Sequence, residues 1–272
     1  MPLADLPQYS TSSLDQPVYY TRQGRGAPLL LIHGSLCDYR YWRWQIPALS
    51  DLHQVVAPSL RGCWPAALRG PDASYSVAQH ARDLAGLIRE LHGDRPVHVL
   101  GHSRGAQVAV ELARLAPELV GSLILADPGF RLAGEPPAPS VHSQAVALLQ
   151  QGQAEAALSL FVDTVNGAGT WAKMVGWFKA MVRDNAYTLL SQIREIELAV
   201  DPAHIAGLEH PVLLIGGAHS PRRYASRMDA LQALWPAAPR VTIPMASHGM
   251  NLANPKAFNT AVAEFLAPLS RR

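Results

Sequence analysis

The sequence predicts an α/β protein built on a doubly wound, mostly parallel sheet that is interrupted by one all-helical insertion. Short apolar runs of strand length alternate with amphipathic runs of helix length, which is the pattern of parallel strands joined by crossover helices. Strand-like runs stop between residues 132 and 206, where helical patterns alone occur, and they resume afterwards. We therefore expect residues 1–131 and 207–272 to form one core, and residues 132–206 to form a helical insertion above it.

The predicted strands are short runs rich in Val, Leu and Ile between Gly, Pro or polar residues. They lie at residues 17–21, 28–32, 53–57, 97–100, 122–126, 211–215 and 240–243. The predicted helices show apolar residues at three- and four-residue spacing. They lie at 39–49, 77–92, 106–116, 222–235 and 255–266, with several more between 141 and 200, after the pattern breaks at Pro136, Pro137 and Pro139. Ser76 and Gln79 form a capping pattern before the second of these helices, and Gly93 ends it.

Composition limits the classes of function. A chain of 272 residues with 49% hydrophobic and 16% charged residues and a net charge of +2 fits one large globular domain. The near-neutral charge, with scattered Arg residues, argues against nucleic acid or an anionic membrane as a partner. Residues 1–16 lack the pattern of a signal peptide and no apolar run approaches the ~20 residues of a membrane span, so we expect a cytoplasmic protein.

The two cysteines, Cys37 and Cys63, can pair in principle, but free thiols are expected in a reducing compartment. Neither cysteine has the spacing of a metal ligand. The cysteine spacing therefore predicts no metal site. We also expect a small-molecule substrate and no cofactor.

One stretch carries the strongest functional signal. The apolar run from residue 97 leads into Gly-His-Ser-Arg-Gly, with Ser103 at its centre and a helix behind it. In a sharp strand-to-helix turn the central serine is strained, and only glycine fits at Gly101 and Gly105, two positions before and after it. The turn exposes the hydroxyl above a helix N-terminus, which favours negative charge. Ser103 is therefore the predicted nucleophile, against the alternative of an ordinary turn that contains a serine.

Together with two further landmarks, this stretch resembles an α/β-hydrolase with a helical cap. These landmarks are His33-Gly34 after an early strand, and Ala246-Ser247-His248 near the end of the chain. The resemblance implies the fold, with residues 132–206 as the cap, and a base on a late loop, because the chain order in this family is nucleophile, acid, base. His248 occupies that place and is the predicted base. His219, which also follows a predicted strand, is its rival.

The acid departs from the usual pattern of the family. Most relatives carry an Asp after the strand that follows the cap, whereas this chain has Ser220 there. A serine cannot orient and neutralise an imidazolium as a carboxylate does. Asp127 is the predicted acid, because haloalkane dehalogenases and cofactor-free ring-cleaving dioxygenases resemble this layout, with the acid at that earlier strand end. The alternative is that Asp127 only caps the turn before Pro128.

The same resemblance places the oxyanion hole and the substrate pocket. The backbone N–H groups of Ser35 and Arg104 are the predicted oxyanion donors. In the insertion, Trp171, Trp177 and Phe178 recur at helical spacing and form either the packing face of the cap or a wall of the pocket.

Three functions follow. The leading one is a serine hydrolase that cleaves an ester, thioester or lactone of a small hydrophobic or aromatic substrate through an acyl-enzyme. A second is a cofactor-free dioxygenase or a carbon–carbon hydrolase, which the resemblance also allows. A third is a non-catalytic binding protein on a hydrolase scaffold. A serine at position 103 argues against dehalogenases and epoxide hydrolases, which resemble this fold but use an Asp nucleophile.

Overall fold

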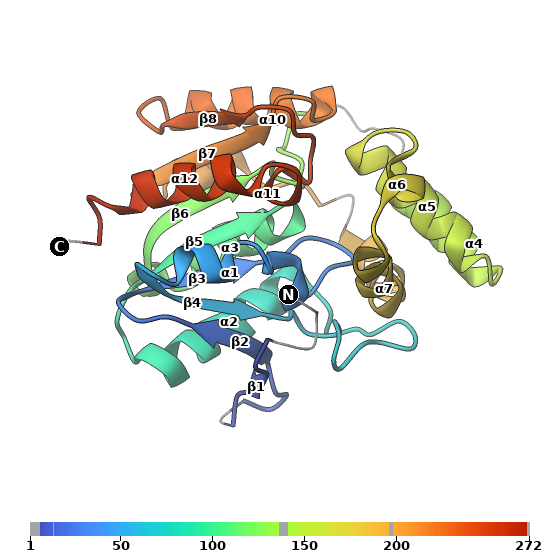
Figure 1. The fold of residues 1–272 in the computed structure, drawn as a ribbon, viewed down its shortest axis with the longest axis horizontal. Coiled ribbons are helices and arrows are strands. Elements are labelled where there is room, and N and C mark those ends of the chain that lie inside the picture. The colour runs from blue at the N-terminus through green and yellow to red at the C-terminus, as the bar shows by residue number, and fades with distance from the viewer. Residues whose placement is uncertain (1–5, 13, 136–140, 196–197, 271–272) are drawn as a thin grey trace.

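The computed structural model describes residues 6–12, 14–135, 141–195 and 198–270. Within these residues the chain forms an eight-stranded, mostly parallel sheet with helices on both faces, as the sequence predicts (Figure 1). The strands are β1 (Tyr9–Ser10), β2 (Tyr19–Gln23), β3 (Ala27–Ile32), β4 (His53–Pro58), β5 (Val97–His102), β6 (Val120–Ala126), β7 (Val212–Gly217) and β8 (Arg240–Ile243). Their order across the sheet is β1-β2-β4-β3-β5-β6-β7-β8, with β1 and β2 antiparallel to their neighbours and the others parallel.

Helices connect these strands. The α-helices are α1 (Ile46–Leu49), α2 (Val77–His92), α3 (Arg104–Leu115), α4 (Val141–Gln150), α5 (Ala154–Asn166), α6 (Thr170–Lys173), α7 (Gly176–Asp184), α8 (Thr188–Gln192), α9 (Pro202–Ala206), α10 (Arg222–Leu234), α11 (Met250–Ala253) and α12 (Pro255–Leu266). The described residues also form the short 3₁₀ helices η2 (Tyr39–Trp42), η3 (Pro117–Leu119) and η4 (Ile193–Glu195). Helices α4 to α7 gather beside one end of the sheet (Figure 1).

Alternation along the strands divides the core into two layers. Leu29 and Leu31 of β3 pack with α1 and α12 on one face, and Leu30 and Ile32 pack with α2 and α3 on the other. Successive side chains of a strand point to opposite faces, so a strand covered on both sides must be apolar throughout. This explains the continuous apolar run of β3 in the sequence.

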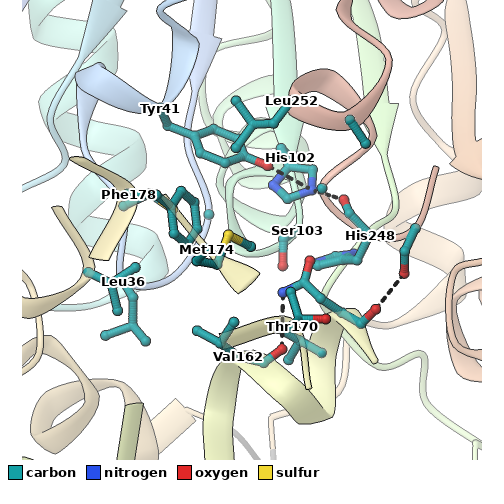
Figure 2. A pocket seen from close by; sticks show the side chains of 18 of the residues that line it. Leu36, Tyr41, His102, Ser103, Val162, Thr170, Met174, Phe178, His248 and Leu252 are labelled. Atoms are coloured by element: carbon teal, nitrogen blue, oxygen red, sulfur yellow. Dashed lines mark hydrogen bonds between the residues drawn. The ribbon is translucent and has the colours of Figure 1, made fainter. Parts of the chain in front are cut away.

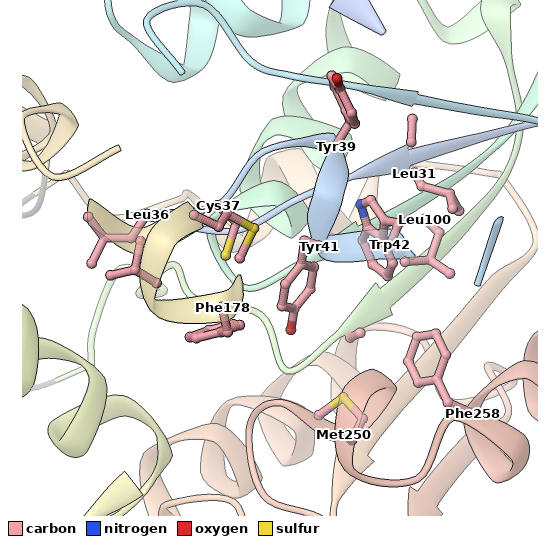
Figure 3. Packing of buried hydrophobic residues seen from close by; sticks show 14 of the residues in the cluster. Leu31, Leu36, Cys37, Tyr39, Tyr41, Trp42, Leu100, Phe178, Met250 and Phe258 are labelled. Atoms are coloured by element: carbon pink, nitrogen blue, oxygen red, sulfur yellow. The ribbon is translucent and has the colours of Figure 1, made fainter. Parts of the chain in front are cut away.

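The first of these layers continues into the helices between β6 and β7. Figure 3 shows Trp42 packed near Phe258, with Leu36, Cys37 and Phe178 further along the same cluster. Phe178 belongs to α7, whereas Leu36 and Cys37 follow β3. One hydrophobic cluster therefore joins these helices to the sheet, and both cysteines are buried as free thiols.

Some element boundaries differ from the prediction. The predicted helix at 39–49 is two short pieces, η2 and α1, because Asp38 caps the first and Pro47 lies in the first turn of the second. The two-residue strand β1 was not predicted, since so short a run has no detectable alternation. Ser76 and Gly93 do cap α2, with Gly93 at a φ of 61°. Pro136, Pro137 and Pro139 lie outside the described residues.

A buried ion pair ties α7 to the segment after β3. Asp38 is fully buried and receives hydrogen bonds from Arg40 Nε at 2.8 Å and from Asn185 Nδ2 at 2.8 Å. Arg40 also reaches Asp184 at 2.8 Å and lies over the ring of Trp64, 4.0 Å from its centroid.

Of the helices that the structure describes, none has both the length and the apolar character required to span a bilayer.

We predict that Arg40→Met lowers the free energy of unfolding by about 3–5 kcal/mol, because it leaves the buried carboxylate of Asp38 without its cation. Arg89→Met is the matched control, since Arg89 and Glu118 form a pair with both side chains half exposed, which is worth about 1 kcal/mol or less. Urea denaturation measures both. Equal losses in the two variants would contradict a special role for the buried pair.

Candidate active site

The turn that holds the predicted nucleophile, Ser103, connects β5 to α3. Ser103 has a φ of 54° and a ψ of −120°, outside the regions that ordinary residues favour. A Cβ atom on Gly101 would lie 2.3 Å from the carbonyl oxygen of Gly105, and one on Gly105 would lie 2.3 Å from that of Ile32. Both positions therefore require glycine because backbone approaches too closely for a side chain. The turn is held by the hydrogen bond of 3.0 Å from Ser103 N to the carbonyl oxygen of Ala126.

Asp127 follows β6 directly and faces the loops after β7 and β8. Its backbone N–H donates to the carbonyl oxygen of Ile215 at 2.9 Å, and its side chain is almost fully buried. His248 Nδ1 contacts Asp127 Oδ2 at 3.3 Å, and the Ser220 hydroxyl donates to the same oxygen at 2.5 Å. The carboxylate thus binds both the predicted base and the serine at the place where most relatives carry their acid.

Burial governs the protonation of this pair. It raises the pKa of Asp127 to about 6, although the Ser220 hydroxyl, His102 and the backbone N–H of Gly217 act in the opposite direction. Burial, with the nearby guanidinium groups of Arg223 and Arg227, lowers the pKa of His248 to about 3. At neutral pH an ionised Asp127 only accepts hydrogen bonds, so His248 carries its proton on Nδ1 and leaves Nε2 as an acceptor. That is the state in which an imidazole can take a proton from a hydroxyl.

Ser103 and His248 line the same cavity and lie beside each other in Figure 2. Among the hydrogen bonds of the described residues, none joins Ser103 Oγ to His248. Such contacts often tighten only when substrate is bound. The rival base, His219, is exposed, and its backbone N–H donates to the carbonyl oxygen of Ala246. The structure therefore brings His248, and not His219, to Ser103 and Asp127.

Two aromatic rings contact the imidazole of His248. Tyr224 of α10 stacks on it with centroids 4.1 Å apart, and the ring of His102 lies 4.6 Å from it. His102 Nε2 also donates to the backbone carbonyl oxygen of His248 at 2.8 Å, which connects the turn of Ser103 to the loop of His248. Sequence reasoning missed both residues. Only the place of His102 next to Ser103 could have indicated it, and nothing along the chain relates Tyr224 to His248.

The predicted oxyanion donors belong to two segments that adjoin Ser103. Gly34 packs against the serine, since a Cβ on Gly34 would lie 3.0 Å from Ser103 Cβ, and Ser35 follows it. Arg104 begins α3, and a Cβ on Gly129 would lie 2.9 Å from both Arg104 N and Ser103 Oγ. The start of α3, where the positive end of the helix dipole lies, is thus next to the predicted nucleophile. Ser35 Oγ accepts a hydrogen bond of 2.8 Å from Gln192 Nε2 of α8.

A cavity of about 440 Å³ opens in front of Ser103, a size that suits a small organic molecule. Its walls are mainly apolar and come from both the sheet side and the helices between β6 and β7. Figure 2 shows Leu36, Val162, Met174 and Phe178 around the space that Ser103 and His248 face. Tyr41 of η2, a few residues after Ser35, is also part of the wall.

Trp177 and Phe178 are among the residues that line this cavity, and Trp171 is not. The expected continuous helical face is interrupted, because Met174 and Val175 are extended between α6 and α7. Trp171 is instead buried beneath Lys179 and Arg183, whose charged groups lie 5.2 and 5.7 Å from its ring centroid.

Within the described residues, no group of three or more His, Cys, Asp or Glu side chains could hold a metal ion.

Comparisons with known proteins agree with this architecture. The model of the alpha/beta hydrolase family matches residues 29–261. The soluble epoxide hydrolase of Corynebacterium sp. (strain C12) is 35% identical over 43% of this chain and 41% of its own length. The RutD protein of Klebsiella pneumoniae (strain 342), which carries the name of a carbamate hydrolase, is 27% identical over 90% of this chain and 93% of its own. The chain spans less than half the length of the first curated relatives it matches.

Among solved structures, the enol-lactonase of Burkholderia xenovorans LB400 superimposes with a TM-score of 0.81 and 20% identity, covering 95% of this chain and 100% of that one. A thermophilic esterase of Thermogutta terrifontis gives a TM-score of 0.80 and 21% identity over 97% of this chain and 99% of that one. At this identity the two structures establish the fold alone. The match of the family model across most of the chain shows that this protein belongs to the alpha/beta hydrolase family.

Proposed function

We propose that this chain is a serine hydrolase that cleaves a carboxylic ester, thioester or lactone with a hydrophobic or aromatic part, through an acyl-enzyme. The observation that carries the proposal is the strained Ser103 turn beside His248, whose imidazole is bound to the buried carboxylate of Asp127. The mainly apolar cavity of about 440 Å³ supports the choice of a hydrophobic or aromatic substrate.

In the proposed mechanism, Ser103 Oγ attacks the carbonyl carbon while His248 Nε2 takes its proton. The N–H groups of Ser35 and Arg104 stabilise the negative charge that develops on the carbonyl oxygen. Asp127 keeps the proton of His248 on Nδ1 and stabilises the imidazolium that forms. The proton then passes to the leaving group as its bond to carbon breaks, and water releases the acyl group from Ser103 by the same steps in reverse.

We expect a fluorophosphonate probe to label the protein at Ser103, because an activated serine hydroxyl displaces fluoride from such reagents. Mass spectrometry of the labelled peptide identifies the site, and Ser103→Ala is the control that should take up no probe. An intact wild-type protein that remains unlabelled would overturn the serine mechanism. It would favour instead a cofactor-free oxygenase on this fold or a non-catalytic binding protein.

Asp127→Asn is predicted to reduce kcat by roughly 10³–10⁴-fold with little change in KM, because an amide cannot enforce the required tautomer or neutralise the imidazolium. A p-nitrophenyl ester assay measures both constants. Ser220→Ala is the matched control, because it removes a neighbour of the carboxylate and keeps the carboxylate itself. We expect it to retain most of its turnover at pH 8. Near-full turnover of Asp127→Asn would remove Asp127 from the proposed set.

The acidic limb of the pH profile provides a separate prediction. Activity requires an ionised Asp127, whose pKa is about 6, so kcat/KM should fall as the pH decreases through that value. The Ser220 hydroxyl is one of the groups that lower the pKa of Asp127, so its removal raises that pKa. Ser220→Ala should therefore move the midpoint to higher pH by about 0.5–1, the equivalent of one hydrogen bond. A midpoint that stays in place or moves to lower pH would contradict this arrangement.

A further inference from the structure

One peptide of the loop after β6 is held at both of its polar groups. Its carbonyl oxygen, that of Pro128, accepts a hydrogen bond of 2.9 Å from Arg227 Nη1 of α10. Its N–H group, that of Gly129, donates to the carbonyl oxygen of Ser103 at 2.9 Å. Because a peptide is planar, these two bonds together fix its orientation between α10 and the turn of the predicted nucleophile.

The predicted acid lies between two backbone hydrogen bonds to Ser103. Ser103 N donates to the carbonyl oxygen of Ala126 at 3.0 Å, and the bond from Gly129 N closes the other side. Asp127 and Pro128 form the segment in between. Asp127 has a φ of 38°, a left-handed conformation that is costly for a residue with a side chain. Such a conformation persists only where the surrounding contacts hold it.

Arg227 supplies the contact on the outer side of this segment. Its side chain is 9% exposed and also pairs with Glu135 at 3.0 Å, so its guanidinium is held from two directions. Pro128 is buried, and within the residues that the structure describes its carbonyl oxygen accepts a hydrogen bond from Arg227 alone. Removal of the guanidinium therefore leaves a buried acceptor unpaired and takes away the contact that orients the peptide.

The same helix also contacts the predicted base. Tyr224, which precedes Arg227 by three residues on α10, stacks on the imidazole of His248. Residues at this spacing share one face of a helix, so one face of α10 adjoins both His248 and the loop of Asp127. His248 Nδ1 and Asp127 Oδ2 are 3.3 Å apart, slightly more than is usual for such a bond. The pair thus leaves little room for a shift of the loop.

We infer that Arg227 is a positioning residue for the proposed acid: through the carbonyl oxygen of Pro128 it holds the strained segment of Asp127, and so keeps the carboxylate against the imidazole of the proposed base. The inference rests on the proposed serine hydrolase. Ser103 lines the cavity of about 440 Å³ and a smaller one of about 100 Å³, and Arg227 lines neither. Arg227 therefore acts on the reaction only through the residues that it holds.

The charge of Arg227 has the opposite effect on the reaction. Burial, and after it the guanidinium groups of Arg223 and Arg227, lower the pKa of His248. A cation at position 227 thus disfavours the imidazolium that forms when the serine proton is taken. If charge were the only effect, removal of Arg227 would raise turnover. If position is the effect, removal lowers turnover, and the sign of the change distinguishes the two.

Arg227→Met is expected to lower kcat by about 10–100-fold and to change KM by less than about 2-fold, because a displaced carboxylate alters the reacting geometry and not the cavity. A p-nitrophenyl ester assay measures both constants. In an Asp127→Asn background the same substitution should cost less than about 2-fold, because no carboxylate is left to position. A merely structural role would lower kcat equally in both backgrounds, and that result would overturn the inference.

Arg61→Met is the matched control. Arg61 pairs with Asp83 at 2.7 Å, its side chain is 11% exposed, close to that of Arg227, and it lines neither cavity beside Ser103. We expect this variant to lose stability in urea without loss of kcat, because the ion pair that it breaks holds no part of the site. A loss of kcat equal to that of Arg227→Met would show that any broken buried pair lowers turnover, and would contradict the assignment.

Arg227→Lys keeps the charge and the aliphatic stem, and it provides a second variant if Arg227→Met does not fold. Its ammonium lacks the planar fork that bonds Pro128 and Glu135 together, so kcat should still fall by about 5–10-fold at unchanged KM. Wild-type or higher turnover in either variant would overturn the inference while the serine mechanism stands. Loss of the proposed function is distinct, because then the wild-type protein cleaves no ester and Ser103 takes up no fluorophosphonate.

Discussion

The crowded backbone around Ser103 is the constraint on which the site depends. The chain passes from β5 to α3 so tightly that Gly101 and Gly105 approach other backbone atoms closer than any Cβ would permit. Gly129 and Gly34 pack against the same serine from the β6 and β3 loops. Two other loops therefore converge on the turn that holds Ser103, and the strain at Ser103 is sustained by the parallel strands that surround it.

The proposed acid, Asp127, lies at a different strand end from the one that the family pattern predicts. Asp127 ends β6, whereas Ser220 follows the neighbouring strand β7, and the two side chains meet in a hydrogen bond. A carboxylate at either position would lie beside the same imidazole, because the ends of adjacent parallel strands are neighbours. The serine that replaces the usual acid is part of the environment of Asp127, where its hydroxyl keeps the carboxyl more acidic than burial alone would.

Much of the fold could be predicted because it depends on local patterns. Strand β8 and helix α12 begin and end where the periodicity places them, and the glycines around Ser103 mark the turn by themselves. The arrangement of the site could not be predicted to the same extent. His102 and Gln192 act through contacts with residues more than a hundred positions away, and no pattern along the chain encodes such pairs. Trp171 illustrates the opposite failure, since a periodicity that looked continuous conceals the extended break between α6 and α7.

The Asp38–Arg40 pair has a consequence for how parts of such proteins can be exchanged. Arg40 and Asp38 lie on the core side, and Asp184 and Asn185 reach them from α7 and the residue after it. A chimera whose covering helices lack an Asp and an Asn at these two positions would lose both partners while keeping the buried carboxylate and guanidinium of the core. The segment that holds Asp38 and Arg40 and the segment that holds Asp184 and Asn185 therefore have to be exchanged together. This requirement restricts recombination at a contact that lies away from Ser103.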